Sequence, residues 1–486
     1  MVSHKIRFGR DVFIAAIATG LKSVRNLLLI RFISFNLSLA EYGIWEQIAV
    51  GLALVLPWIT LQLPSALLRF LPGIEDNHRW RDDFYSVFTF VVVTSSLFAL
   101  LIYFCKTLFF SYPHLQIFVQ HANLIALLIP LSAAVNTTII LLRALRKMFT
   151  HSMLTLTQNF GEFALIGYVL SQGQGLGSAL LSLAIIRASI ALAGLAIAHS
   201  QFGFAPPTFK RVREYLTYTI PLVPNSSFYR IFDAGDRYVL SYFWGHTAVG
   251  TYSAAYTMSS FFTTLISPIN MVLLPMMAEL WNQQRIGELG DYMSQAIRYS
   301  TLLSLPALAG AIYLAPSLLP LLMPETSVSA APFFGLLSCS FLIFGIGILG
   351  GNVLATAGLT RLLFFIDFTL AVFNLLLNLL LVPTIGIMGA VVATLLSHTC
   401  YTLTVLYKAH HIAPFHVPWL AMIHSSVGSA IMLTVLLLLN TWALFSLVGQ
   451  ITVGITIYTI FMLITGGIQK REVLYFARML KGIGSQ

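Results

Sequence analysis

Four charged side chains lie within one apolar stretch, between Tyr218 and Trp244, that is long enough to cross a bilayer. They are Arg230, Asp233, Asp236 and Arg237. At 100° per residue the four fall within an arc of about 120°, so they share one face of a helix. Each would cost roughly 2.5–3.5 kcal/mol at the centre of a bilayer, so this face must contact protein or water rather than lipid.

Two kinds of chemistry are open to this charged face. Arg230 with Asp233, and Asp233 with Arg237, have the spacing of helical ion pairs, which would make the cluster structural. If the face instead borders an aqueous cleft, its guanidinium groups are available to an anion. Arginine can bind two phosphate or carboxylate oxygens at once.

Lys22 and Arg25 form a second group near the middle of the first apolar segment. They lie one turn apart on one face, and their own helix offers no carboxylate within reach. Two like charges at mid-membrane require a water-filled cavity and an anion that enters it. We therefore interpret this pair as part of a binding site for a phosphate or carboxylate group.

The remaining candidates are spread over other apolar segments. Glu162 and Arg187 lie at similar depth on consecutive segments, where they could pair. Arg69 lies near a helix end, from which a long side chain can reach the headgroups. Asp367 is a further carboxylate within a span. Basic residues outnumber acidic ones in these segments, so a central cavity would be positive.

The composition predicts the elements that hold these residues. Of 486 residues, 58% are hydrophobic and 9% are charged, which is typical of an integral membrane protein. We predict an all-α polytopic protein with about fourteen transmembrane helices. Their expected ranges are 11–34, 44–70, 84–108, 117–142, 152–171, 178–199, 217–243, 249–280, 295–316, 333–356, 362–382, 387–407, 419–439 and 446–466.

Lysine and arginine segregate strongly when the loops between these segments are alternated. One side collects eighteen of them and the other only Lys106, so the positive-inside rule places both termini in the cytoplasm. The net charge of +10 is thereby explained by topology. No nucleic-acid partner is expected, because the basic residues are dispersed over many short loops.

An internal repeat divides the chain. "EYGIW" at 41–45 parallels "AVGTY" at 248–252, with Gly43 and Gly250 in register, and "GLGSAL" at 175–180 parallels "GIMGAV" at 386–391. The offset carries Lys22 onto the position beside Arg230, so both halves bring cations to one depth. We predict a six-helix N-lobe (1–208), a six-helix C-lobe (209–415) and two further helices with a basic tail (416–486). Parallel repeats of this kind are a transporter architecture.

Motifs for other activities are missing from the sequence. It contains no P-loop, GxSxG or HExxH pattern, and its three cysteines form no CxxC. No loop is long enough for a soluble domain, which argues against a membrane glycosyltransferase. We expect no enzyme activity, no metal and no cofactor.

Three segments resemble a known family. They are "LSLAEYGIWEQI" (37–48), "GDRYVLSYFWGHTAVGTYSAAYTM" (235–258) and "NLLLNLLLVPTIGIMGAVVAT" (374–394). They are similar to segments of polysaccharide flippases of the O-antigen flippase (Wzx) type, in the multidrug/oligosaccharidyl-lipid/polysaccharide exporter superfamily. Asp236 and Arg237 take the positions of the family's Asp-Arg pair.

The resemblance implies two facing six-helix lobes, alternating access and a cationic lumen. The implied substrate is a polyprenyl-diphosphate-linked oligosaccharide, such as an O-antigen unit of lipopolysaccharide, carried across the bacterial inner membrane. The cationic lumen corresponds here to Lys22, Arg25, Arg69 and Arg230. Coupling to H⁺ or Na⁺ would fall to Glu162, Asp233 or Asp367, and polysaccharide-assembly proteins are possible partners besides membrane lipids.

Two alternatives stay open on the sequence. A small-molecule or multidrug exporter of the same superfamily would favour an acidic or apolar lumen, because typical drugs are cationic. A non-transport membrane scaffold would have a lumen too narrow for a diphosphate.

Overall fold

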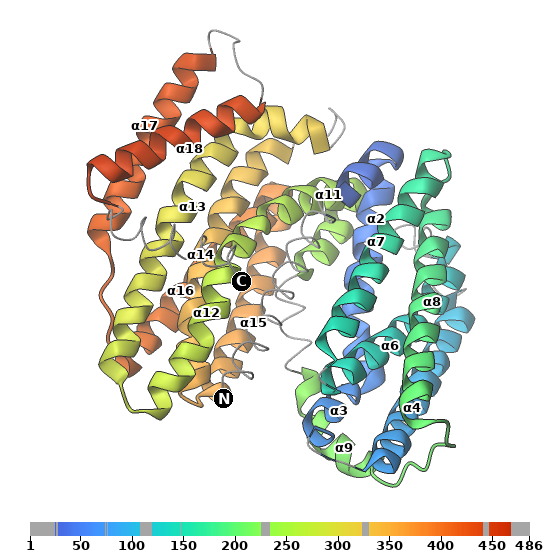
Figure 1. The fold of residues 1–486 in the computed structure, drawn as a ribbon. Coiled ribbons are helices and arrows are strands. Elements are labelled where there is room, and N and C mark those ends of the chain that lie inside the picture. Colours follow the sequence, from blue (N-terminus) through green and yellow to red (C-terminus); the bar gives the residue numbers. More distant parts are fainter. Residues whose placement is uncertain are drawn as a thin grey trace, which may run out of the picture. The chain divides into compact units, whose positions relative to one another are not determined.

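The computed structural model describes residues 25, 28–72, 74, 76–106, 119–145, 147–224, 234–322, 330–440 and 447–467. Within these ranges the chain is helical almost throughout, and they contain no β-strand (Figure 1). The all-α prediction is therefore confirmed. Lys22, Arg230 and Asp233 lie outside the described residues, so what the sequence predicts for them stays a prediction.

The chain divides into two compact units. Unit 1 comprises Met1–Ala254, Leu322–Pro324 and Ala371–Ala390, and unit 2 comprises Ala255–Leu321, Glu325–Leu370 and Val391–Gln486. Unit 1 holds the helices α2 (Leu39–Thr60), α3 (Pro64–Phe70), α4 (Asn77–Cys105), α6 (Ala122–Ala144), α7 (Met148–Ser171), α8 (Leu176–Phe202), α9 (Val212–Thr219) and most of α11 (Asp236–Ser259).

Unit 2 holds the later helices. They are α12 (Phe261–Asn282), α13 (Ile286–Leu322), α14 (Ala331–Thr356), the first part of α15 (Thr360–Ile385), most of α16 (Ile387–Ile412), α17 (Trp419–Asn440) and α18 (Leu447–Ile464).

Local sequence sets where α2 begins and ends. Ser38 caps its N-terminus: its hydroxyl accepts a hydrogen bond from the backbone N–H of Glu41, whose carboxylate accepts one from the N–H of Ser38. After Thr60 the backbone turns left-handed at Leu61 (φ 48°) and Gln62 (φ 52°). Pro64 then starts α3, because proline fits the first turn of a helix.

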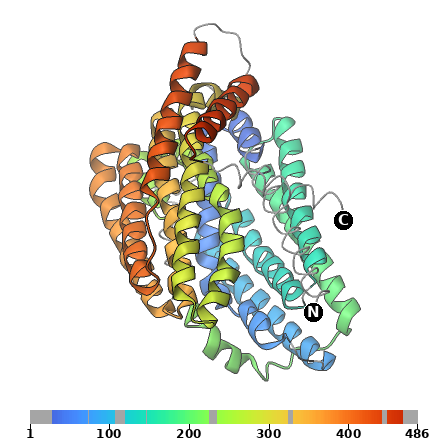
Figure 2. The same cartoon turned by 60° about the vertical axis from the view of Figure 1, so that its left-hand side comes forward.

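Within unit 1, α6 packs against both α4 and α8, and the three helices run side by side (Figures 1 and 2). A small residue permits the approach of α8 to α6. A Cβ added at Gly194 would lie 2.4 Å from the Cβ of Thr138. In lipid there is no hydrophobic driving force for apolar side chains to pack on one another. Close van der Waals contact of this kind therefore contributes much of the association between membrane helices.

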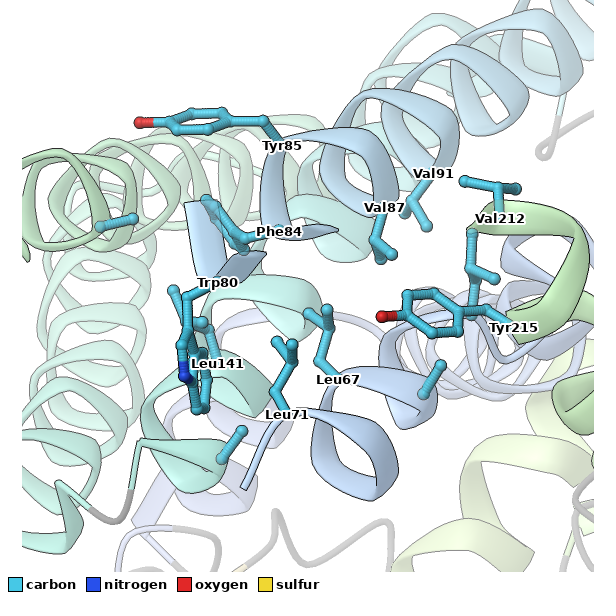
Figure 3. Packing of buried hydrophobic residues seen from close by; sticks show 14 of the residues in the cluster. Leu67, Leu71, Trp80, Phe84, Tyr85, Val87, Val91, Leu141, Val212 and Tyr215 are labelled. Atoms are coloured by element: carbon cyan, nitrogen blue, oxygen red, sulfur yellow. The ribbon is translucent and has the colours of Figure 1, made fainter. Parts of the chain in front are cut away.

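A buried apolar cluster ties the short helices α3 and α9 to this bundle. Figure 3 shows Leu67 of α3, Leu71 directly after α3, Phe84 of α4 and Tyr215 of α9 within it. The ring of Phe70 stacks on Tyr215 with 5.1 Å between centroids. Helix α9 is thereby packed against the first helices of unit 1.

Glycines also mediate helix packing in unit 2. A Cβ at Gly345 would lie 2.4 Å from Ile266 of α12, and one at Gly347 would lie 2.5 Å from Thr402 of α16. These glycines belong to the run "GIGILGGN" (345–352), whose small residues allow neighbouring helices to approach closely.

Eleven helices among the described residues are long and apolar enough to cross a membrane. They correspond to eleven of the fourteen predicted segments. Residues 11–34 lie mostly outside the described residues, 217–243 do so in part, and α7 is not among the eleven. One run, Asp236–Asn282, contains both α11 and α12, and α11 itself bends at Gly245 (φ 77°). The chain is a multi-pass membrane protein.

Candidate functional site

Glu162 of α7 lies between two arginines in the interior of unit 1. Its Oε2 is 3.2 Å from Nη2 of Arg25, and its Oε1 is 3.3 Å from Nε of Arg187, which α8 supplies. Arg25 is 8% exposed and Glu162 is 6% exposed. The pair of Glu162 with Arg187 that the sequence indicates is thus present.

The position of Arg25 corrects one expectation. The sequence describes it as a cation without a counter-charge, whereas the structure gives it a carboxylate from another helix. Glu162 stands 137 residues away in the chain, so the local spacing around Arg25 could not reveal it. Because Glu162 has two oxygens, it neutralises one arginine and contacts two.

Neutral groups hold the three charged side chains in place. Gln158, one turn before Glu162, donates to its Oε1 at 3.1 Å. Nε of Arg25 donates to the backbone carbonyl of Asn159 at 2.9 Å, and Nη1 of Arg187 donates to the hydroxyl of Ser132 at 2.5 Å. We call these six residues the Glu162 cluster. With two guanidinium groups and one carboxylate, its charge is +1.

The net charge of +1 on the Glu162 cluster bears on its stability and on the ligands that it could attract. Inside a protein, removing one partner of a buried ion pair leaves a charge that costs about 3–5 kcal/mol. The cluster is stable as it stands because each guanidinium has an acceptor. Phosphate oxygens offer arginine the same geometry as a carboxylate, so a phosphate group is chemically compatible with both guanidinium groups.

A second group of buried charges lies at the start of α11. Asp236 and Arg237 are both buried, and Nη1 of Arg237 is 3.5 Å from Oδ1 of Asp236. Nε of Arg237 donates to Ser253 at 3.0 Å and lies 3.9 Å from Oε2 of Glu46 on α2. The hydroxyl of Tyr252 donates to Asp236. In the structure, then, Asp236 and Arg237 contact each other and neighbouring helix residues.

Glu46 was missed by the sequence reasoning. The sequence could have indicated Glu46 because it lies inside the second predicted segment, 44–70, where burying a carboxylate in the bilayer costs free energy. Beside it, Gln47 makes three contacts with α11: its Nε2 donates to the carbonyl of Arg237 (3.3 Å), its Oε1 meets Nδ1 of His246 (2.9 Å), and its carbonyl accepts from Tyr238 (3.2 Å).

The two repeat-related glycines meet at this crossing. A Cβ at Gly43 would lie 2.0 Å from the carbonyl oxygen of His246, and one at Gly250 would lie 2.2 Å from that of Leu39. Here α2 and α11 touch backbone to backbone, and each repeat contributes its glycine to the contact. The sequence indicates the register of these two glycines but not their contact.

Two further candidates, Arg69 and Asp367, lie among the described residues. Arg69 is exposed in the last turn of α3. Asp367 is half-buried on α15, in unit 2. Among the described residues, no group of three His, Cys, Asp or Glu side chains is placed to hold a metal ion.

Comparison with known proteins gives one family. Residues 8–281 match the model of a family described as polysaccharide biosynthesis protein. The chain is 26% identical over 166 residues to the probable flippase AglR of Haloferax volcanii, which covers 34% of this chain and 35% of that protein. The matches span about a third of the length of each of the first curated relatives.

Two solved structures share the fold. The lipid II flippase MurJ, in an inward closed conformation, is 15% identical with a TM-score of 0.77, over 94% of this chain and 99% of MurJ. An inward-facing multidrug resistance transporter of the MATE family and MOP superfamily is 13% identical with a TM-score of 0.66, over 80% of this chain and 94% of the transporter. Since the family model covers more than half of the chain, the protein belongs to the polysaccharide biosynthesis protein family.

Proposed function

We propose that this protein is an alternating-access flippase that moves a polyprenyl-diphosphate-linked oligosaccharide across the inner (plasma) membrane. The glycan we propose is an O-antigen or similar polysaccharide repeat unit, and polysaccharide-assembly proteins are its proposed partners. Both termini are assigned to the cytoplasm. The proposed lobes are residues 1–208 and 209–415, with 416–486 as the appended helices. Family membership and the description of AglR as a probable flippase support this class of activity.

One observation carries the choice of an anionic substrate: the buried Arg25 and the half-buried Arg187 share one carboxylate in the Glu162 cluster. A cluster of charge +1 inside a membrane protein is suited to an anion and unsuited to a cationic drug. A diphosphate has oxygens for both guanidinium groups, so it can replace Glu162 without leaving either arginine uncompensated.

Ion coupling would follow from the same exchange. A proton, or a Na⁺ ion, on Glu162 cancels the counter-charge of the two arginines and so strengthens their attraction for an anion. Loss of that proton restores the ion pairs and expels the anion. We propose Glu162 as the coupling group on this ground, with Asp233 and Asp367 as the further candidates of the sequence.

Complementation in cells tests the proposal. Strains that lack the gene receive Arg25→Gln, Arg187→Gln or wild type, and surface glycan is measured relative to the amount of protein in the membrane. We expect both variants to reach the membrane and to display at least tenfold less glycan, a loss equal to about 1.4 kcal/mol.

Arg285→Gln is the matched control, because Arg285 is exposed and contacts Glu288 on a short loop. It should display glycan at the wild-type level. Wild-type display by both cluster variants would exclude an anion-binding role for these arginines.

A further inference from the structure

The segment that joins α8 to α9 is fixed to the start of α4. Nε of Arg211 donates to both carboxylate oxygens of Asp83, at 2.9 and 3.1 Å, and the hydroxyl of Tyr215 donates to the same carboxylate at 2.6 Å. The backbone N–H groups of Thr208 and Phe209 donate to the hydroxyl of Ser86, both at 3.1 Å. Five hydrogen bonds therefore tie a stretch of eight residues to one turn of α4.

The anchor keeps its protons under physiological conditions. Burial, together with the hydrogen bond to Asp83, raises the pKa of Tyr215, so the phenol remains a donor. Burial alone would lower the pKa of Arg211. The hydrogen bond and the negative charge of Asp83 have the larger combined effect, so the pKa of Arg211 is raised. Arg211 shares the Asp83 carboxylate with Arg79, whose Nε lies 3.7 Å from Oδ2 of Asp83.

The outer face of this segment is aromatic and basic. Phe204 is 68% exposed, Phe209 is 44% exposed and Tyr218 is 37% exposed. Lys210 and Arg213 are exposed beside them. We call these five residues the linker surface. On α9 the buried side chains are Val212, Tyr215 and Thr219, at helical spacing, so Arg213 faces away from the core. The ring of Tyr218 lies at the edge of the core, where it meets Phe70 edge-on with 5.4 Å between centroids.

The backbone presents the linker surface in one conformation. Pro206 and Pro207 have fixed φ angles and no backbone N–H. Phe209 adopts φ 52°, a left-handed conformation that a bulky residue rarely takes unless its surroundings hold it. Here the bond from its N–H to Ser86 does so. The backbone of Phe209 is therefore fixed at an exposed position. The ring of Phe204 packs edge-on against Tyr85, with 5.3 Å between centroids.

We infer that the linker surface docks on anionic phospholipid headgroups at the membrane face, with the aromatic rings at headgroup depth and Lys210 and Arg213 on lipid phosphates. Aromatic side chains favour this interface, and basic side chains are drawn to anionic lipid. The predicted topology puts the segment on the cytoplasmic side, where basic loops collect.

The aromatic rings and the cations of the linker surface contribute differently to lipid binding. Each cation near an anionic surface changes lipid affinity by roughly fivefold. Glu214 is also exposed on α9 and offsets one of the two cations. The rings therefore supply much of the attachment, while the cations supply the preference for anionic lipid.

The test uses the full-length protein in nanodiscs of phosphatidylcholine, with or without phosphatidylglycerol. Cys105, Cys339 and Cys400 are replaced by serine, and a fluorophore is attached at Phe209→Cys. We expect bromine-labelled lipid to quench this probe, and brominated phosphatidylglycerol to quench it more than brominated phosphatidylcholine. Lys210→Gln with Arg213→Gln should abolish that preference while leaving the Asp83 anchor intact.

The control probe is Gln283→Cys, in the exposed turn between α12 and α13. It should show little quenching by either lipid. If the probe at 209 is no better quenched than the probe at 283, the linker surface does not contact lipid, as would be the case if it bound a protein. If the double variant keeps the full preference for phosphatidylglycerol, Lys210 and Arg213 do not bind the headgroups.

Discussion

At the scale of single residues, Glu162 supplies the carboxylate that the buried Arg25 and the half-buried Arg187 share. Each of its two oxygens contacts one guanidinium, and Gln158 donates to one of them. A glutamine at 162 would keep the shape and lose the charge. Arg25 would then lose its ion pair with Glu162 and keep its hydrogen bond to the carbonyl of Asn159.

We predict that Glu162→Gln lowers the free energy of unfolding by about 3–5 kcal/mol, because it leaves the buried Arg25 and the half-buried Arg187 without their shared carboxylate. Adding Arg187→Gln should recover part of this loss, since one of the cations is removed. The measurement is the unfolding midpoint of both purified proteins in one detergent. An unchanged midpoint for the single variant would mean that the arginines have solvent or lipid phosphate as counter-charge.

The Glu162 cluster shows where sequence reasoning stops at this scale. The pair of Glu162 with Arg187 is predictable, because consecutive helices place residues of equal depth side by side. The contact with Arg25 is not, since it depends on how the helix that carries Arg25 packs against α7. Serine and glutamine partners such as Ser132 and Gln158 are common in membrane helices and give no signal of their own.

At the scale of elements, the crossing of α2 and α11 depends on two glycines. The backbone of each helix lies where the Cβ of the other would be, at 2.0 Å from Gly43 and 2.2 Å from Gly250. Neither neighbour is the end of a flexible side chain. A methyl group at either position must therefore push the helices apart and disturb the contacts of Gln47 with Arg237 and His246.

We predict that Gly43→Ala and Gly250→Ala each destabilise the protein by about 1–3 kcal/mol, the usual range for overpacking. Thermal unfolding of the purified variants measures this effect. Gly287→Ala is the control, because nothing lies within 4 Å of a Cβ there. Equal melting of Gly43→Ala and Gly287→Ala would contradict a backbone contact at this crossing.

The anchor of α9 makes a separate prediction. Asp83→Asn removes the charge that Arg211 and Tyr215 share, and we expect the segment 203–220 to exchange its amide hydrogens faster. Because the side chain of Arg211 is 36% exposed, solvent screens the pair, and we expect global stability to fall by only about 1–2 kcal/mol.

Hydrogen exchange of Asp82→Asn provides the comparison. Asp82 is the preceding residue in the chain, and its carboxylate pairs with the half-buried Arg81 at 3.2 Å. Exchange in 203–220 should stay at the wild-type rate in this variant. If both variants accelerate exchange equally, Asp83 has no special role in holding the segment.

At the scale of the whole molecule, hydropathy predicts most of the membrane-spanning helices. Eleven of the predicted segments coincide with helices able to span a membrane, because length and apolar composition are all that spanning requires. The bend at Gly245 was not predicted. Nor was the short helix α9, which the pattern assigned to the margin of a span, because its stability comes from Asp83 and the apolar cluster around Leu67.

The repeat was also visible in the sequence, through Gly43 and Gly250 in register. The contact between these two glycines became apparent only from the structure, since register in a sequence repeat says nothing about contact.

The proposed activity also concerns the whole molecule. It requires that the two arginines of the Glu162 cluster exchange their carboxylate for the diphosphate of a lipid-linked glycan as the protein cycles.

The most direct measurement is the flipping of a fluorescent polyprenyl-diphosphate-linked sugar in proteoliposomes, followed by the fraction of label that an impermeant quencher can reach. We predict that wild type flips the lipid, that Arg25→Gln with Arg187→Gln does not, and that Arg285→Gln does so at the wild-type rate. Flipping by the double variant at the wild-type rate, with equal amounts of folded protein, would contradict the account.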